Sequence, residues 1–561
     1  DSHRPSDHLP VLARISTPMR RTGHARLPNH VVDHPAYSKH LDALQTELLS
    51  TLPPEDALEM VKQFFREAAG LARAELAHGG HGPTKIKLAG VIACIRAARL
   101  RDKRASRRAV VLAPHLAGFI DHRTAMIINP VAVRDSLHEL MEAAINEDLR
   151  SLEASPLPAD RKKPKRDHLR QRHALWRSCR RKATGMSLCD PDGHPIVDSH
   201  AIGAHLVAHW GPTFTAKATD RAAAAVFLAH VQEVPASFSW EISPAMLDSA
   251  IDATGSSAPG PDGVPYGAWR SANSLCRNVL YRILDSTLTA EARLPDRFNH
   301  SHLIFIPKNT DVSDSMDIGH SAGDFRPLNL SNSDNKVLAL ALNGRLSELC
   351  QTTVASPQRG FVAGRHIEDN LFGLEAAAIS LSATNLKRSA TILFDFRTAF
   401  PSLAHDWIFA VLSQMGIPSY FIHAVRQLYF DCSAMLLFNG AELDSLLLSS
   451  GIKQGCPMSG SLFALAIDPL IRYLLHTSVM GSICITAFAD DIAIVVANLF
   501  TMLPGILAVF TRWALASSLS LNSVKSAIIP LWIFDEAMIW RWLRTVAPSF
   551  ATVHYTHPTL P

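Results

Sequence analysis

The chain has 561 residues, of which 47% are hydrophobic, and a formal net charge of +4. This length and composition suit a globular protein with several domains and a large core. The eight cysteines form no Cys-x-x-Cys pair, which argues against a zinc-ribbon site or a disulfide framework and favours a reducing compartment.

Residues 16–240 are rich in Ala, Leu and Arg and are predicted to be mostly helical. Two basic runs lie here, at residues 96–108 and 161–182. The second holds 11 Lys and Arg against one acid, a local charge of +10 that leaves the rest of the chain near −6. Such runs suit a polyanion such as nucleic acid, although a solvated helix face or a localisation signal explains either run alone equally well.

Two turn-forming segments follow, at residues 190–198 and 255–265. The sequence DPDGHPIVD at residues 190–198 predicts a turn or hairpin. It does not fit a calcium loop, because its sixth position is Pro195 rather than Gly and its twelfth is Ala201 rather than Glu. The Gly/Pro-rich segment at residues 255–265 predicts a rigid loop at the entry to an α/β region.

Beyond residue 265, short β-branched runs alternate with longer apolar segments, which predicts strands interleaved with helices. The expected elements are a strand at 302–308, a loop or strand and then a helix over 324–346, a strand ending at Asp395, a glycine-containing loop and long helix over 449–475, two short strands within 486–497, and a closing segment at 519–531.

Asp490 and Asp491 lie at the turn of the hairpin predicted within TAFADDIAIVVA, with apolar residues on both sides. Buried carboxylates are costly unless a cation pairs with them, and hard divalent cations prefer oxygen ligands. The alternative is a solvated turn, because Asp is common in turns. A further carboxylate elsewhere in the chain is needed to favour a metal site.

Asp395 supplies that carboxylate, at the end of the apolar strand ATILFDF and 95 residues before Asp490. On neighbouring strands the carboxylates can share two divalent ions roughly 4 Å apart, which stabilise the attacking and leaving oxygens of an in-line phosphoryl displacement. Mg²⁺ suits this role, because it binds through one or two carboxylates and substrate phosphates. Asp395 alone would suit the N-cap of a following helix.

Seven motifs in this order resemble the reverse transcriptase of non-LTR (LINE-type) retrotransposons over residues 255–530. The resemblance is fainter over residues 140–250. The motifs are Pro307-Lys308, FRPLNL, QRGFVAGRHIEDN, FDFRTAF, GIKQGCPMS, FADD and LNSVK.

The resemblance implies an α+β right-hand polymerase fold with fingers, palm and a partial thumb, preceded by a mostly helical N-terminal region. The implied division is 1–15 as the C-terminal remnant of an endonuclease domain, 16–240 as a helical, basic N-terminal or linker region, 241–392 as fingers with palm entry, 393–535 as palm, and 536–561 as the start of a truncated thumb.

The same resemblance implies that Asp395, Asp490 and Asp491 are the catalytic acids and metal ligands. Asp395 and Asp490 would ligate Mg²⁺, or alternatively Mn²⁺, most directly, and the Phe396 carbonyl would assist. Thr398 stands where the family often has Lys. Pro401 and Gly460 likewise replace a frequent Asp and a frequent Pro, but none of these departures removes a metal ligand.

Three basic residues are implied to act on the triphosphate. Lys308 and Arg326 would hold the incoming nucleotide, and Arg can do so bidentately. Lys525 would donate a proton to the leaving pyrophosphate. Each of them alone is more often a solvated surface charge.

Three further residues are implied to shape the nucleotide site. Phe400 would lie under the sugar, where a bulky ring excludes a ribose 2′-hydroxyl. Gln454 and Gly455 would form a loop against the nucleotide and template, because glycine permits close backbone approach. The alternative for Phe400 is an ordinary core aromatic. The alternative for Gln454 and Gly455 is a turn that leads into the following helix.

The hexapeptide SDHLPV at residues 6–11 resembles the last motif of the apurinic-endonuclease-like nuclease of these elements. In that family the aspartate, here Asp7, orients the histidine, here His8, at the scissile phosphate. The other nuclease carboxylates are expected to lie upstream of this fragment, so no nuclease activity is predicted. No ribonuclease H motif or Cys/His knuckle occurs in residues 532–561.

The implied partners are an RNA template, a DNA primer or target, and deoxynucleoside triphosphates, in a nuclear or cytoplasmic ribonucleoprotein. No membrane is expected. The one uncharged window of membrane-span length, residues 492–511, contains Asn498 and Pro504-Gly505 and favours strand, turn and helix. The sequence does not indicate the oligomeric state.

Three competing functions remain open. An RNA-dependent RNA polymerase shares the palm carboxylates, but Phe400 and the FADD tip in place of Gly-Asp-Asp argue against it. A truncated, non-catalytic copy would bind nucleic acid through its basic runs. A group II intron maturase is a close mechanistic relative, and the nuclease remnant at Asp7-His8 argues against it.

Overall fold

The computed structural model describes most of the chain between residues 26 and 548. The endonuclease-like motif with Asp7 and His8, and nearly all of the basic run at 161–182, lie outside the described residues. Within 26–548 the gaps are 45, 79–83, 100–105, 107–108, 111–113, 122–123, 125, 155–161, 163–165, 167–186, 290–293, 309–318, 384–387 and 478–481.

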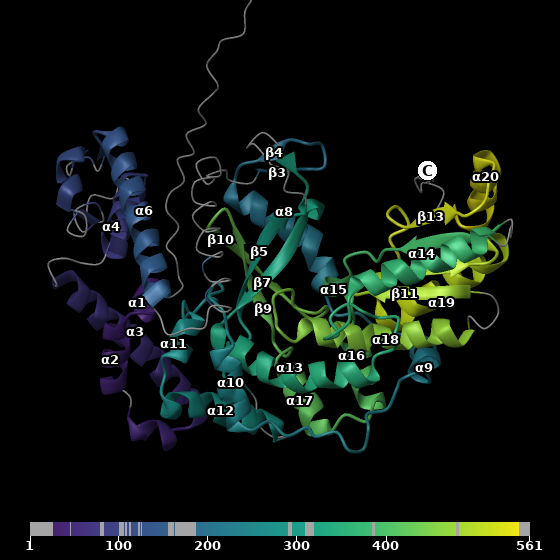
Figure 1. Ribbon diagram of the computed structural model, residues 1–561, viewed down its shortest axis with the longest axis horizontal. Coiled ribbons are helices and arrows are strands. Elements are labelled where there is room, and N and C mark those ends of the chain that lie inside the picture. Colours follow the sequence, from purple (N-terminus) through teal and green to yellow (C-terminus); the bar gives the residue numbers. More distant parts are fainter. Residues whose placement is uncertain are drawn as a thin grey trace, which may run out of the picture.

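The first main sheet has four strands in the order β10-β9-β5-β7 (Figure 1). Strand β5 (Ser301–Pro307) pairs antiparallel with β7 (Phe325–Ser331) and parallel with β9 (Ser433–Phe438). Strand β10 (Ala441–Leu447) forms a hairpin with β9. The strands expected at 302–308 and near 324 are thus confirmed as β5 and β7.

Helix α8 (Ser199–Phe214) covers this first sheet, which we call the fingers sheet. Leu206 and Trp210 pack with Phe305 and Phe325 in one hydrophobic cluster. Strand β3 (Ser187–Cys189) pairs with β4 (Pro195–Ile196), as expected for the turn at 190–198, and runs parallel to β6 (Gly319–His320). Residues 187–214 therefore pack on the fingers sheet. The domain boundaries given above from the resemblance remain predictions.

The second main sheet, the palm sheet, is antiparallel with the order β11-β12-β8-β13. Its strands are β8 (Ala390–Phe394), β11 (Ser482–Phe488), β12 (Asp491–Val496) and β13 (Ala527–Pro530). Strand β12 is buried at four of its six positions, because sheet neighbours and helices cover it. The hairpin predicted within residues 486–497 is confirmed as β11 and β12.

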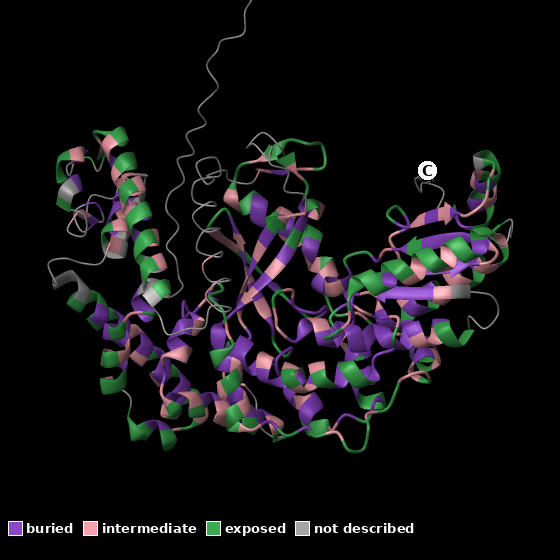
Figure 2. Cartoon of the chain, viewed as in Figure 1, coloured by how far each residue is buried: buried purple, intermediate pink, exposed green. Residues whose placement is uncertain are grey.

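Helices pack on both faces of the palm sheet, and Figure 2 shows buried residues concentrated along its strands. Helix α14 (Ile367–Ala383) contacts β11 and β12. Helix α19 (Leu499–Ser517) covers the face that carries Phe394. The ring centroids of Phe394 and Phe510 lie 4.6 Å apart. Helix α18 (Ser459–Thr477), the long apolar helix expected over 449–475, lies between the palm and α13 (Ser333–Thr353).

Among the described helices, α19 is the one that is long and apolar enough to cross a membrane. Its Trp513 is fully buried against Phe227 and Trp407, with ring centroids 5.1 and 5.0 Å apart. By length and composition alone, one such helix is weak evidence for a membrane span. The strand, turn and helix predicted over residues 492–511 are confirmed as β12, residues 497–498 and most of α19.

The first helices of the chain, up to α3, form part of the main hydrophobic core. Helix α3 (Pro54–His78) packs on α12 (Ser274–Leu288), and Phe65 lies edge-to-face on Trp269 at 4.9 Å. A smaller cluster joins α4 (Thr84–Arg99) to α6 (Pro130–Ala154). Residues 16–240 are mostly helical wherever the structure describes them, as predicted.

The remaining elements connect these layers, and together with the sheets they confirm the expected α+β class. They are α1 (Asn29–Val32), α2 (Pro35–Leu44), η1 (Glu47–Ser50), η2 (Pro114–Phe119), β1 (Ile120–Asp121), β2 (Met126–Ile127), α9 (Arg221–Leu228), α10 (Pro244–Asp252), α11 (Tyr266–Arg270), η4 (Ala322–Asp324), α15 (Ala399–Ser402), α16 (His405–Gln414), α17 (Ser419–Gln427) and α20 (Glu536–Val546).

Candidate active site

The sheet register brings the three predicted acids together. Strands β8 and β12 are antiparallel neighbours, and Phe394 pairs with Ile492. Asp395 follows Phe394 and Asp491 precedes Ile492, so the same register places these two carboxylates opposite each other at the end of the sheet. Directly opposed residues in antiparallel strands have Cα atoms about 4.5–5.5 Å apart.

Asp490 lies in the tight turn between β11 and β12. Phe488 pairs with Asp491, which leaves Ala489 and Asp490 as the two residues of the turn. Ala489 adopts the left-handed conformation, with φ of 57°. This turn is the reason that Asp490 and Asp491, although adjacent in the chain, both face Asp395 closely enough to interact with it electrostatically.

The electrostatics of the three acids favour a bound cation. Burial, followed by the charges of Asp491 and Asp395, raises the pKa of Asp490 to about 6. Burial and Asp395 also raise the pKa of Asp491, while Lys525 opposes the rise. None of the three carboxylates forms an ion pair within the described part of the chain. Clustered oxygen ligands that lack a cation match the preference of Mg²⁺.

Asp395 is oriented by the segment after α19. Its Oδ2 accepts a hydrogen bond from Asn522 Nδ2 at 2.9 Å, and its carbonyl accepts one from Asn522 N at 2.7 Å. The N-cap of α15 is Thr398, so the alternative role of Asp395 as a helix cap is wrong. Sequence reasoning did not assign a role to Asn522, although the motif LNSVK contains it.

Of the three predicted triphosphate-binding residues, Lys308 and Lys525 lie near these acids, and Arg326 lies near Lys308. Lys308 follows β5 and donates from Nζ to the Gly323 carbonyl at 2.6 Å. Burial lowers its pKa, as do the charges of Lys525 and Arg326, whereas Asp395 raises it. Lys525 is exposed and lines a cavity of about 470 Å³ together with Asp395 and Asp491. The fingers and palm thus contribute positive charge to one site.

Phe400 lies between two other aromatic rings. It stacks on Phe463 with centroids 4.5 Å apart and meets Phe361 edge-on at 5.7 Å. A Cβ atom at Gly460 would lie 2.7 Å from the Phe361 ring, so a side chain there would require that ring to move. Phe396 is buried, with its ring 5.8 Å from that of Phe510, so its side chain belongs to the palm core.

The loop of Gln454 and Gly455 packs on β7 of the fingers sheet. The Gln454 carbonyl accepts a hydrogen bond from Asn329 N at 2.7 Å. Gly455 has φ of 107°, and a Cβ atom there would lie 2.6 Å from the Asn329 carbonyl oxygen. Only glycine fits this close approach. Gln454 and Gly455 thereby lie beside the strand that carries Arg326.

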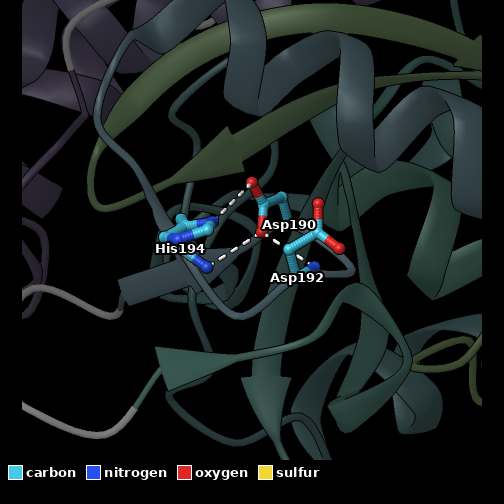
Figure 3. Close-up of side chains that lie close together, drawn as sticks. All are labelled: Asp190, Asp192 and His194. Atoms are coloured by element: carbon cyan, nitrogen blue, oxygen red, sulfur yellow. Dashed lines mark hydrogen bonds and ion pairs between the residues drawn. The ribbon is translucent and has the colours of Figure 1, made fainter.

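A second group of potential metal ligands lies in the β3–β4 turn (Figure 3). The ligand atoms of Asp190, Asp192 and His194 lie within 4.8 Å of one another. Asp190 Oδ1 accepts hydrogen bonds from the backbone N–H groups of Asp192 and His194 at 3.0 and 2.8 Å. These bonds are typical of an Asp that closes a turn, and they account for the arrangement without a cation.

Comparison with known proteins gives matches in the region that contains this site. Residues 306–540 match the sequence model of the family described as reverse transcriptase (RNA-dependent DNA polymerase). The chain is 25% identical over 249 residues to the transposon TX1 uncharacterized 149 kDa protein of Xenopus laevis. It is 28% identical over 245 residues to the retrovirus-related Pol polyprotein from type-2 retrotransposable element R2DM of Drosophila melanogaster. It is 24% identical over 290 residues to the retrovirus-related Pol polyprotein from type-1 retrotransposable element R2 of Popillia japonica.

These three alignments cover 43%, 43% and 50% of the chain, and 18%, 22% and 38% of the respective relatives. The chain therefore spans less than two fifths of the length of the relatives that it matches. Together with the family match, they confirm the resemblance to non-LTR reverse transcriptases.

Proposed function

We propose, from the premise that residues 306–540 form a reverse transcriptase domain of the non-LTR retrotransposon type, that the protein extends a primer 3′-hydroxyl with deoxynucleotides on an RNA template. The observation that carries this proposal is the convergence of Asp395, Asp490 and Asp491 without a cationic partner at ion-pair distance in the described structure. Such a cluster is costly in itself, which supports a functional role.

Asp395, Asp490 and Asp491 would hold Mg²⁺, which when bound stabilises the attacking and leaving oxygens of a phosphoryl transfer. The Phe396 carbonyl would assist, and Mn²⁺ is the alternative ion. Lys308, Arg326 and Lys525 would neutralise and orient the triphosphate, since their charges meet beside Asp395. Catalysis would come mainly from positioning and charge neutralisation.

The proposed partners are an RNA template, a DNA primer or target, and deoxynucleoside triphosphates. The basic runs at 96–108 and 161–182 would add a contact to the nucleic-acid backbone that depends on salt concentration. A nuclear or cytoplasmic ribonucleoprotein without a membrane fits these partners. The relatives' names assign them to retrotransposable elements.

The proposed function is tested by primer extension on an RNA template with Mg²⁺ and deoxynucleotides. Asp395→Asn should lower the extension rate at least about 10³-fold, because a metal ligand contributes several kcal/mol to the transition state. Asp192→Asn, at an exposed turn acid, should extend at the wild-type rate. A wild-type chain that binds primer–template but does not extend it would instead support a non-catalytic, nucleic-acid-binding copy.

Phe400→Val should reduce the preference for deoxynucleotides over ribonucleotides by about 10- to 100-fold, since pocket contacts of this size are worth about 1–3 kcal/mol. The stacking on Phe463 and the edge contact with Phe361 hold the ring in place. The ratio of kcat/KM for dCTP and CTP measures the effect. Phe372→Val, at an exposed position of α14, serves as the control. An unchanged ratio would leave Phe400 a core aromatic and reopen the RNA polymerase alternative.

A further inference from the structure

The turn that presents Asp490 is held in an unfavourable backbone conformation. Ala489 has φ of 57°, a region that residues with a Cβ atom rarely adopt. Its side chain is buried, so the turn cannot relax freely into solvent. Such conformations persist where the surrounding structure determines them, so the groups that contact Ala489 must hold the turn in this conformation.

Gln358, from the motif QRGF, satisfies both backbone polar groups of Ala489. Its Nε2 donates to the Ala489 carbonyl at 3.0 Å, and its Oε1 accepts from Ala489 N at 2.9 Å. The same Oε1 also accepts from Gly360 N at 2.8 Å. The residue is completely buried, so no water competes for these three hydrogen bonds.

The segment around Gln358 runs beside β11 like a short extra strand. Gln358 forms a parallel bridge with Ala487. Ala487 N donates to the Pro357 carbonyl at 3.0 Å, and Arg359 N donates to the Ala487 carbonyl at 2.9 Å. A Cβ atom at Gly360 would lie 2.2 Å from Ala489 N. The segment is therefore in van der Waals contact with the turn, and a side chain at residue 360 would collide with it.

The other end of this segment is anchored to helices. Arg365 donates to the carbonyls of Val354, Ala355 and Gln358 at 2.7–2.8 Å. Asp468 of α18 accepts from Ala355 N at 2.7 Å and is itself paired with an arginine one turn later. Because α18 is a core helix, residues 354–360 form a rigid connection from the core to the turn.

We propose that Gln358 is a positioning residue that holds the Ala489 turn so that Asp490 faces the metal and the triphosphate. This inference rests on the proposed function, because it assigns the effect of Gln358 to the same carboxylates. Gln358 itself does not touch the reacting atoms. The alternative is that Gln358 is a buried core residue that contributes to folding alone.

Gln358→Met keeps the length of the side chain and removes all three hydrogen bonds. It should lower kcat for primer extension at least about tenfold and raise the half-saturating Mg²⁺ concentration at least about threefold. The KM for dNTP should change less than about twofold, because the fingers residues are untouched. Gln427→Met, at another buried glutamine in a helix, is the matched control and should change none of these values.

Adding Ala489→Gly to Gln358→Met should restore much of the lost rate, since glycine adopts a positive φ without a steric penalty. Gly360→Ala perturbs the same contact while leaving Gln358 intact, and it should reproduce the effects on kcat and Mg²⁺. This second variant decides the question if Gln358→Met does not fold, as judged by its melting curve.

Mn²⁺ binding to the nucleotide-free protein, followed by electron paramagnetic resonance, separates this inference from the proposed function. Weaker Mn²⁺ binding in Gln358→Met or Gly360→Ala supports the inference even if the wild-type chain fails to extend primers. Wild-type Mn²⁺ affinity and Mg²⁺ dependence in both variants would overturn it, as would a rate loss that follows the folded fraction alone. A wild-type protein that binds no Mn²⁺ would also overturn it.

Discussion

Replacing Lys62 with methionine is expected to lower the free energy of unfolding by about 3–5 kcal/mol, the usual cost of removing one partner from a buried ion pair. Lys62 Nζ lies 2.7 Å from Asp334 Oδ2 and 3.2 Å from Asp262 Oδ2. All three side chains are at least 92% buried. Neither Oδ2 atom accepts any other hydrogen bond, so the substitution would leave two uncompensated carboxylates in the core.

This triad joins α3 to the Gly/Pro-rich loop at residues 255–265 and to the first turn of α13. Burial alone would lower the pKa of Lys62, but Asp334 and Asp262 outweigh it and raise the pKa. The helical region at 26–78 is thus tied electrostatically to the main core of the protein. Its removal should destabilise the whole domain rather than release an independent linker.

Urea denaturation measures the effect of Lys62→Met as a shift in midpoint with an unchanged slope. The control is Lys39→Met, because Lys39 pairs with Glu75 at 3.5 Å on the surface. An exposed pair of this kind is worth about 0–1 kcal/mol. If the two variants were destabilised equally, the buried triad would contribute no more than a surface contact.

Asp490→Asn is expected to abolish primer extension and yet to stabilise the metal-free protein by roughly 1–3 kcal/mol above pH 7. The folded protein raises the pKa of Asp490 from 3.8 to about 6 through burial and the neighbouring acids. One pKa unit corresponds to about 1.4 kcal/mol. An ionised Asp490 therefore opposes folding, and asparagine removes that charge.

The stability difference should depend on pH in a defined direction. Between pH 3.8 and about 6 the folded state binds more protons at Asp490 than the unfolded state does, so the contribution of this group to stability falls as pH rises. Above pH 6 the penalty is complete, and below pH 4 it disappears. The advantage of Asp490→Asn should therefore be present at pH 8 and largely lost at pH 4.

Thermal denaturation in EDTA at these two pH values measures the difference, with Asp192→Asn as the exposed control. Added Mg²⁺ should stabilise the wild type more than Asp490→Asn, because the ligand binds the folded state through this carboxylate. Equal melting temperatures for wild type and variant at pH 8 in EDTA would show that the charge on Asp490 carries no folding penalty.

The elements that carry the acids were predictable because their signals are local. Asp395 ends a run of β-branched and apolar residues, and the FADD turn divides two such runs, so the composition of the runs and the turn chemistry suffice to define the strands. The seven motifs then gave the resemblance to non-LTR reverse transcriptases, which the family match over residues 306–540 supports. The domain boundaries and the roles of the individual site residues, Phe396, Gln454 and Lys525 among them, remain predictions.

The residues that support the site were not predictable in this way. Gln358 contacts a turn 131 residues later in the chain, Asn522 holds Asp395 across 127 residues, and Lys62 reaches Asp334. A polar residue carries no local signal for a distant partner, because only folding creates the buried site in which its hydrogen bonds become necessary. The sequence alone thus indicated which acids meet and that they lie at the ends of neighbouring strands. The tertiary structure decided what holds them in place, because that depends on which polar groups lose water together when the chain packs.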